Sequence, residues 1–196
     1  MPEIEGLDKF KGLVIHSHDF KSAQTFEGLR VAVVGSSLSA EDITCQLYKY
    51  GAKHVTITHR KQIGGQWVKM GYKWPENVEE RSLFVNANGK KLLFSDGTEV
   101  EVDAIILCTG YKHHFPFLER SLQLECKNLL WINCLKQGVV SPVNNKLYFM
   151  AMTNHFVTWQ HFAAQAWYVR DCLLHRLDNS VPLKDESGQI LTNDDF

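Results

Sequence analysis

A short β-branched run sets the strongest limit on how this chain can fold. The run ends in a glycine and passes directly into an amphipathic segment. Residues 31–42 read Val-Ala-Val-Val-Gly-Ser-Ser-Leu-Ser-Ala-Glu-Asp. Glycine at a strand end allows a tight turn, and the small residues after it let the backbone approach a ligand. The free N–H groups at the start of the following helix suit an anion such as a pyrophosphate. The pattern predicts a dinucleotide-binding βαβ unit, although Ser37 and Ala40 replace the second and third glycines of the usual fingerprint.

The elements around this turn follow at the expected distances. Residues 29–34 are predicted to form a buried strand, residues 38–50 a helix with Gly51 at its C-cap, and residues 55–58 the next strand. The unit therefore spans about 30 residues, as a βαβ unit does. The remaining predicted elements are an antiparallel meander of residues 82–86, 91–94 and 99–102, strands at residues 103–108 and 147–151, and a helix at residues 158–177.

The end of the second strand indicates which coenzyme the unit prefers. NAD-binding units usually place an acidic residue there, to accept a hydrogen bond from the ribose 2′-OH. Here the strand runs into His59, Arg60 and Lys61. A guanidinium can donate two hydrogen bonds to a 2′-phosphate, so NADP(H) is favoured over NAD(H). The alternative is that Arg60 and Lys61 are ordinary solvated charges at a strand end.

The loop after this strand leaves a second interpretation open. Its residues 63–67, Ile-Gly-Gly-Gln-Trp, look like the Gly-Gly-x-Trp element of flavin-binding domains. On that interpretation the βαβ unit would hold FAD, but a flavin site also favours an acidic strand end, and this one is basic. A plain loop without a ligand is the third interpretation of Gly64 and Gly65.

Composition narrows the classes of partner. The 196 residues carry a formal net charge of −1, which gives no electrostatic reason to expect nucleic acid or an anionic membrane. No apolar run reaches the roughly 20 residues of a membrane span, and no signal-peptide pattern opens the sequence. Widely spaced cysteines without CxxC pairs indicate reduced thiols, and they argue against a disulfide framework or a metal site. These cysteines are Cys45, Cys108, Cys126, Cys134 and Cys172. We therefore expect a cytoplasmic protein without a bound metal.

Several motifs, in this order along the chain, resemble flavin-containing monooxygenases. The identifying motif of that family is matched with phenylalanine where tyrosine is commoner, and the family's Ala-Thr-Gly-Tyr linker has a counterpart. These two motifs are Phe10-x-Gly12-x-x-x-His16-x-x-x-Phe20 and Leu107-Cys-Thr-Gly-Tyr111. Residues 35–43, 48–53, 71–77 and 165–171 look more particularly like the bacterial trimethylamine monooxygenase branch of the family. The resemblance covers nearly all of residues 1–180.

The resemblance implies two cofactors, FAD and NADP, and a role for particular residues. Those implied to lie against the NADP pyrophosphate are Gly35, Ser36, Ser37 and Ser39, and those implied to hold its 2′-phosphate are Arg60 and Lys61. Leu38 stands where the bacterial branch has tyrosine, at a contact to the nicotinamide nucleotide. The residues implied to lie near the flavin or a cofactor are Thr109, His155 and Thr158. No catalytic residue of the protein is implied, because the flavin performs the oxygen transfer.

Other prominent side chains are interpreted as structural. A single histidine in a loop is more often a hydrogen-bonded packing residue than a catalyst, so we assign packing to His16. Aromatic residues at helical spacing are more often core than a cage for an ammonium ligand. We therefore expect the core to contain Trp159, Phe162, Trp167 and Tyr168.

The expected fold class is α/β, a Rossmann-like NAD(P)-binding βαβ domain with an antiparallel β-meander, plus the C-terminal part of an FAD-binding domain. Its expected parts are an irregular lead-in at residues 1–28, the NADP(H)-binding domain at 29–110, the FAD-domain portion at 111–180 and a polar tail at 181–196. The N-terminal FAD fingerprint of the family has no counterpart before residue 28. The chain therefore looks like the second half of a larger enzyme.

The function expected from this resemblance is N- or S-oxygenation of soft nucleophiles, such as trimethylamine-like amines or sulfides, with NADPH and O2. In this function the chain supplies the NADP-binding part. Its expected protein partner is a second copy of itself or a complementing N-terminal FAD half. The alternative is a catalytically inactive NADP-binding module that serves regulation or assembly.

Overall fold

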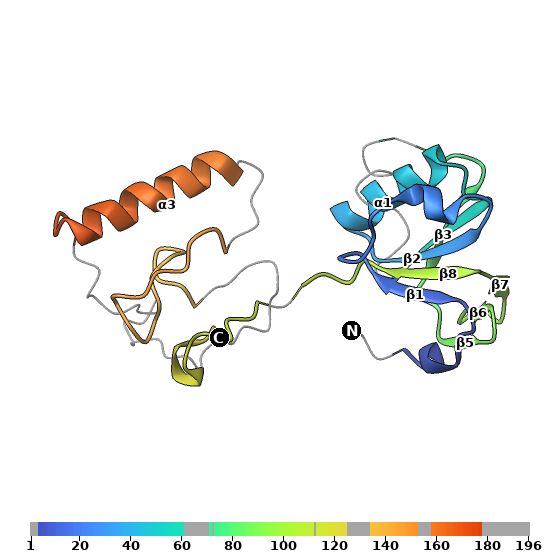
Figure 1. Cartoon of the computed structure of the whole chain (residues 1–196), viewed down its shortest axis with the longest axis horizontal. Coiled ribbons are helices and arrows are strands. Elements are labelled where there is room, and N and C mark those ends of the chain that lie inside the picture. Colours follow the sequence, from blue (N-terminus) through green and yellow to red (C-terminus); the bar gives the residue numbers. More distant parts are fainter. Residues whose placement is uncertain are drawn as a thin grey trace. The chain divides into compact units, whose positions relative to one another are not determined.

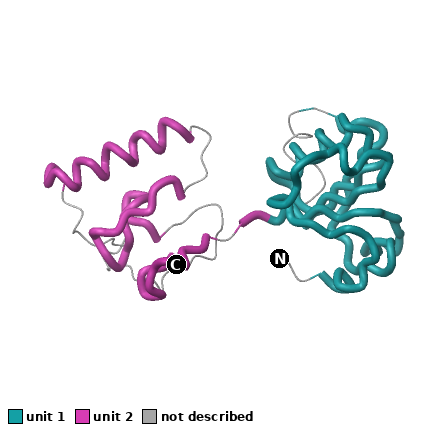
Figure 2. Tube along the Cα trace, in the orientation of Figure 1, with its two compact units in different colours: residues 1–109 teal, residues 110–196 magenta. Residues whose placement is uncertain are grey.

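The computed structural model describes residues 4–60, 71, 73–111, 113–124, 134–152 and 158–177. The chain forms two compact units, residues 1–109 and residues 110–196, which are coloured separately in Figure 2. The first unit contains a sheet and its covering elements, and the second contains loops and one long helix (Figure 1).

A five-stranded parallel sheet organises the first unit. Its strand order is β1-β8-β2-β3-β4, and every neighbouring pair runs parallel. The strands are β1 (Leu13–His16), β2 (Arg30–Val34), β3 (His54–His59), β4 (Val78–Ser82) and β8 (Ala104–Leu107). The central strands β2 and β8 are buried along nearly their whole length, as expected for parallel strands covered on both faces.

Different elements cover the two faces of this sheet (Figure 1). On one face, α1 (Leu38–Lys49) and the short 3-10 helix η2 (Ala23–Phe26) pack against alternate residues of β2, including Val31 and Val33. The other face takes Ala32 and Val34 and is covered by a three-stranded antiparallel meander with the 3-10 helix η1 (Leu7–Lys9). The meander strands are β5 (Asn86–Asn88), β6 (Lys91–Leu93) and β7 (Glu99–Glu101).

The predicted βαβ unit, the last strand of the sheet and the meander are confirmed, with two corrections. The segment 1–28 is not irregular throughout, because β1 lies within it and pairs with β8, about 90 positions later in the chain. The strand expected at residues 82–86 is replaced by two strands, β4, which ends at Ser82, and β5, which begins at Asn86. In both places, pairing with a strand distant in sequence decides where the strand begins and ends. The local hydrophobic pattern does not reveal that pairing.

An ion pair joins the amino ends of β2 and β8. The Arg30 guanidinium donates from Nε and Nη2 to the two carboxylate oxygens of Asp103, each at 3.0 Å, and the Arg30 backbone N–H donates to the same carboxylate at 3.1 Å. Glu101 accepts from Arg30 as well, at 2.6 Å. The hydrogen bonds from Arg30 hold the pKa of the Asp103 carboxyl well below its ordinary value.

Replacing this carboxylate is expected to make stability less dependent on pH. At pH 7, Asp103→Asn should lower the free energy of unfolding by about 1–2 kcal/mol, because it removes charge-assisted hydrogen bonds at a partly exposed site. Since the folded-state pKa is depressed, the contribution is present above the unfolded-state pKa of about 4 and is lost as pH falls through the folded value. Urea unfolding at pH 7 and at successively lower pH below 4 should show the gap to wild type shrinking. A gap that stays constant would contradict this assignment.

The second unit has a small hydrophobic core formed by residues of its loops. Cys134, Leu135 and Phe149 are buried together, with Phe115 packed edge-on against Phe149. The strand expected at residues 147–151 is not formed, and only an isolated bridge links Tyr148 to Val140. The predicted helix is confirmed as α3 (Thr158–Leu173), four residues shorter at its C-terminal end than the predicted 158–177.

The aromatic residues of α3 do not all lie in the core as expected. Trp159 and Trp167 are 80% and 63% exposed, whereas the buried residues of the helix are Gln165 and Cys172. The Gln165 amide accepts from the Ala151 N–H at 3.0 Å and donates to the Gly138 carbonyl oxygen at 3.3 Å. Because this side chain satisfies two loop backbone groups, the inward face of the helix is partly polar, a role that periodicity alone does not reveal.

Candidate functional site

The carboxyl ends of the parallel strands meet at one edge of the sheet, near the start of α1 (Figure 1). From β2 the chain proceeds through α1 to β3 on one side, while β8 and β1 lie on the other side of β2. The edge beyond β2 and β8 is therefore a topological switch point, the position where open α/β sheets bind ligands.

The turn after β2 requires glycine because of the neighbouring strand. Gly35 has φ +146°, and a Cβ at this position would overlap the carbonyl oxygen of Cys108, the residue after β8. The Gly35 N–H donates to the Thr58 carbonyl oxygen at 2.9 Å, and the Cys108 N–H donates to the Val34 carbonyl oxygen at 2.8 Å. The turn is thus held between the ends of β3 and β8.

The first turn of α1 presents a set of donors at this edge. Ser37 is the N-cap residue, and its side chain makes no capping hydrogen bond. Ser37, Leu38 and Ser39 are exposed, and Gly35 and Ser36 are half-buried. Ala40 is 1% exposed and packs the helix onto the sheet, which explains a small residue where the fingerprint has its third glycine. No side chain caps the start of α1, and within its first turn the Ala40 N–H already donates to the Ser37 carbonyl oxygen at 2.8 Å. The N–H groups ahead of Ala40 are therefore the ones that can bind an anion.

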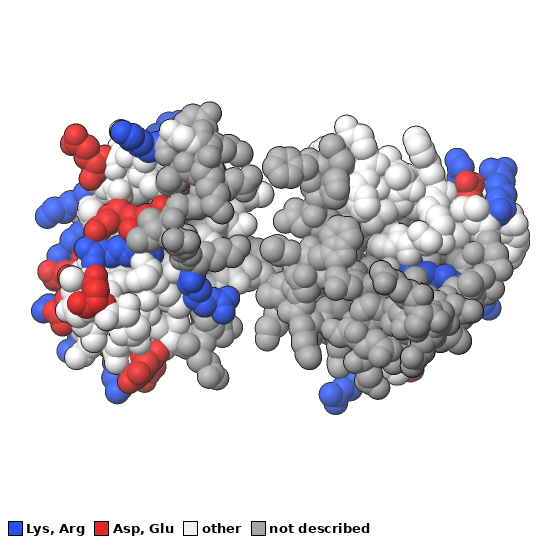
Figure 3. Space-filling view, turned by 180° about the vertical axis from the view of Figure 1, so that it is seen from behind, with Lys and Arg blue, Asp and Glu red and all other residues white. Residues whose placement is uncertain are grey.

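Arg60 follows β3 at the same edge and is exposed. Val34 is paired with Thr58, so Gly35 and Arg60 both lie within two residues of that paired position. Acidic and basic side chains are interspersed on the face of the first unit seen in Figure 3. Lys61 and His155, which the sequence also predicts to bind a cofactor, lie outside the described residues, as does the loop of residues 63–67.

The remaining predicted residues belong to different units. Thr109, half-buried, follows Cys108 at the carboxyl end of β8 and is the last residue of the first unit. Thr158 begins α3 in the second unit. One edge of the first unit thus holds seven of the ten predicted site residues, namely Gly35, Ser36, Ser37, Leu38, Ser39, Arg60 and Thr109.

The motif of residues 10–20 packs β1 into the first unit. Phe10 lies in the core on the meander side, and a Cβ on Gly12 would overlap the Asp103 carbonyl oxygen. Phe20 stacks on Phe26 of η2 at 5.8 Å between ring centroids. The His16 Nδ1 accepts from the His18 N–H at 3.2 Å. These contacts support the structural interpretation of the motif.

A histidine–glutamate pair and a cysteine thiol near this edge were given no role from the sequence. His59, the last residue of β3, lies 2.6 Å from Glu80 of β4, and both side chains are buried. Burial raises the pKa of the Cys108 thiol to about 12, so this thiol is not an available nucleophile near neutral pH. No sequence signal marked Glu80, because its strand was itself not predicted.

The described part of the chain offers little for other kinds of site. Of its cysteines, Cys45, Cys108 and Cys172 form no disulfide. Over the same residues, no group of three or more His, Cys, Asp or Glu side chains is placed to hold a metal ion. None of the helices described is both long and apolar enough to cross a membrane.

Comparison with known proteins gives consistent matches. Residues 2–88 match the family model described as flavin-binding monooxygenase-like. Trimethylamine monooxygenase from Pelagibacter sp. (strain HTCC7211) is 45% identical over 186 residues, which are 95% of this chain and 40% of that protein. The corresponding enzyme from Roseovarius nubinhibens is also 45% identical, over 97% of this chain and 40% of its own length.

Solved structures agree with these matches. The crystal structure of Tmm from Pelagibacter sp. strain HTCC7211 has a TM-score of 0.83 and covers 92% of this chain and 40% of that one. S-allyl-L-cysteine S-oxygenase from Allium sativum is 28% identical with a TM-score of 0.75, at the same coverage. The chain thus spans about two fifths of the length of the relatives it matches. By sequence and by fold, the chain is homologous to the flavin-containing monooxygenases of the flavin-binding monooxygenase-like family.

Proposed function

We propose that the first unit binds NADP(H) at the carboxyl edge of its parallel sheet, as part of a flavin-dependent N- or S-oxygenating enzyme. One observation carries this proposal. An exposed arginine, Arg60, stands at the same edge as a helix start whose N-cap Ser37 makes no side-chain cap. The edge therefore offers donors for a pyrophosphate and a separate guanidinium for the extra phosphate of NADP(H).

The described residues fit this coenzyme. In the proposal, the N–H groups at the start of α1 donate to the pyrophosphate, with Ser36, Ser37 and Ser39 beside it. Arg60, together with Lys61 outside the described residues, holds the 2′-phosphate. Leu38 is 63% exposed at the start of α1, so an apolar side chain, where the bacterial branch has tyrosine, would face the nicotinamide nucleotide.

The same residues do not form a cradle for FAD. Gly35 begins the one dinucleotide-type turn of the described strands and helices, and the strand that follows ends in a basic residue. We therefore assign the main FAD contacts to the three fifths of the relatives' length that this chain does not match. Bound there, FAD would supply the oxygen-activating chemistry, while this chain binds and orients the reduced coenzyme.

The proposed substrates are soft nucleophiles, namely tertiary amines or sulfides. The names of the relatives support this class, because they include a trimethylamine monooxygenase and an S-oxygenase of a cysteine derivative. We also propose a cytoplasmic location, for which the free thiols of Cys45, Cys108 and Cys172 are the support.

Two measurements on the purified chain test this proposal. Fluorescence titration should show that NADPH binds more tightly than NADH, because only NADPH carries the phosphate that Arg60 would contact. Equal binding of both, or binding of neither, would argue against the assigned site. The absorbance spectrum of the same sample should show no flavin bands, because the main FAD contacts are assigned to the part of the relatives that this chain does not match. Flavin bands would contradict that assignment of the FAD contacts.

A further inference from the structure

We infer that the buried pair of His59 and Glu80 positions Arg60 and thereby sets the preference for a 2′-phosphorylated coenzyme. This inference rests on the proposed NADP(H) site. In it His59 and Glu80 do not touch the coenzyme. They are positioning residues that act through the arginine that follows β3.

The pair joins the last residue of β3 to the middle of β4. The His59 Nε2 lies 2.6 Å from the Glu80 Oε1, and the two side chains are only 3% and 7% exposed. Ile57 is paired with Glu80, and His59 with Ser82, so the pair runs diagonally across the two strands. Side chains of paired and alternate residues share one face of a sheet. The pair therefore lies on the face of Ile57, which packs in the core beneath α1.

A second connection holds the end of β3 on the opposite face. The Thr58 hydroxyl donates to the Ser82 carbonyl oxygen at 2.6 Å and accepts from the Phe84 N–H at 3.2 Å. The two residues directly before Arg60 are thus fixed to β4 from both sides of the sheet. Fixing the backbone before Arg60 reduces the freedom of its long side chain in the unbound protein. The entropic cost of ordering that side chain on a ligand is then lower.

The orientation of the His59 ring depends on its hydrogen bond to Glu80. An ionised carboxylate can only accept a hydrogen bond, so Nε2 then carries the proton between the two groups. Among the described residues, the Nδ1 atom of His59 is buried without a hydrogen-bond partner. Within the part of the chain that the structure describes, hydrogen bonding therefore orients the ring through Nε2, and removing the Glu80 carboxylate would remove that hydrogen bond.

Stability alone gives little reason for this arrangement. Burying a carboxyl group and an imidazole costs desolvation energy, and well-packed apolar residues at such positions are often as stable or more stable. The same two strands carry a similar pair at their amino ends, where His54 Nε2 and Glu79 Oε2 are 3.7 Å apart and 34% and 40% exposed. Only the pair beside Arg60 is short and buried. The buried pair is thus the one next to the proposed coenzyme site, and the exposed pair lies at the other end of the same strands.

The test compares coenzyme binding by matched variants of these two pairs. Glu80→Leu should raise the Kd for NADPH about tenfold and change the Kd for NADH less than about twofold, since misplacing a binding group weakens only the contacts it makes. Glu80→Gln, which keeps a hydrogen-bonding group of the same size, should restore most of the NADPH affinity. Glu79→Leu, the matched control at the amino end, should leave both constants unchanged.

A double-variant comparison shows whether the pair acts through Arg60. In an Arg60→Ala background, Glu80→Leu should have no further effect on NADPH binding, because coupled residues are not additive. A folded Glu80→Leu protein with an unchanged ratio of the two Kd values would overturn the inference, as would equal losses for both coenzymes. Should Glu80→Leu not fold, Glu80→Asp, which keeps the charge but lengthens the contact, gives the same comparison and must also lower NADPH affinity. If Arg60→Ala itself leaves NADPH binding unchanged, the proposed function fails, and this inference with it.

Discussion

Replacing Arg60 by alanine is expected to weaken NADPH binding by about 1.5–3 kcal/mol, which is roughly 10- to 150-fold in Kd, and to leave NADH binding nearly unchanged. The reason is electrostatic. The guanidinium would donate charge-assisted hydrogen bonds to the 2′-phosphate, a group that NADH lacks. Because Arg60 is exposed and follows β3, its removal leaves no cavity in the core. Titration of both coenzymes against wild type and variant measures the difference directly.

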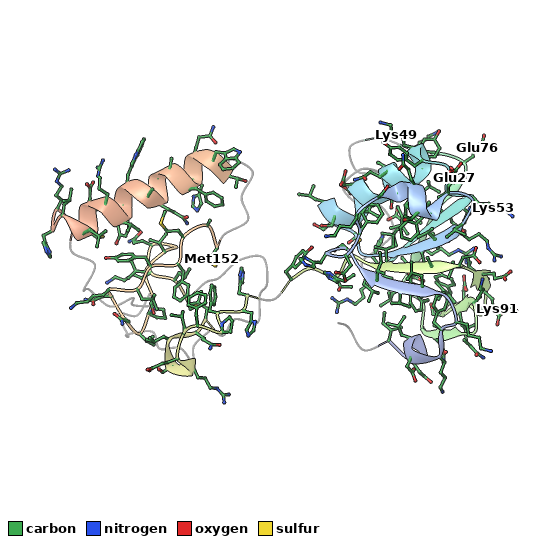
Figure 4. All side chains as sticks on the ribbon, in the orientation of Figure 1. Glu27, Lys49, Lys53, Glu76, Lys91 and Met152 are labelled. Atoms are coloured by element: carbon green, nitrogen blue, oxygen red, sulfur yellow. The ribbon has the colours of Figure 1, made fainter. Side chains whose placement is uncertain are left out.

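The chain offers a matched control on the same strand. Lys53 is an exposed cation directly before β3, at the opposite end from Arg60, and is labelled in Figure 4. Lys53→Ala removes one positive charge from the same unit, so it reproduces any general effect of net charge on an anionic ligand. We expect it to leave both Kd values within about twofold of wild type, as a screened, distant charge should. A similar loss of NADPH affinity in both variants would count against a specific contact at Arg60.

Replacing Gly35 by alanine is expected to lower the free energy of unfolding by about 2–4 kcal/mol, through overpacking together with a strained backbone angle. The added Cβ would overlap the Cys108 carbonyl oxygen, and φ of +146° is a conformation that residues with a side chain rarely adopt. Relief would require the ends of β2 and β8 to separate at the proposed ligand edge. The variant should therefore also bind NADPH more weakly.

The variant Gly28→Ala separates the two causes of destabilisation, steric overlap and backbone strain. Gly28 also has a positive φ, +71°, but a Cβ there would meet nothing within 4 Å. This variant carries only the backbone strain, so we expect a loss of about 1–2 kcal/mol. Urea denaturation of the two variants and the wild type gives the comparison. Equal losses for Gly35→Ala and Gly28→Ala would contradict the proposed close approach between the turn and β8.

The parts of the fold that were predicted correctly depend on local pattern. The β-branched run that becomes β2, the helix α1 and the strand β3 follow each other within 30 residues, and their periodicities are those of the structures they form. Seven of the predicted site residues lie at one edge for the same reason, since parallel strands joined by a helix bring their carboxyl ends together.

The parts that were missed depend on distant partners. β1 has only four residues and exists through its pairing with β8, and Glu80 meets His59 because β4 is aligned beside β3. Trp159 and Trp167 lie at spacings typical of a buried helix face, yet Gln165 occupies the inward side because loop backbone groups need its amide. A single sequence does not show which polar groups, distant along the chain, need a hydrogen-bond partner.

Neighbouring residues are enough to predict the dinucleotide-type turn, the basic end of the strand after it and the resemblance to flavin-containing monooxygenases. Three other features become visible in the folded chain, namely the need for glycine at position 35, the places of β1 and β4, and the buried His59–Glu80 pair beside Arg60. These features depend on steric overlap, strand register and burial, which arise between groups that folding brings together from distant parts of the chain.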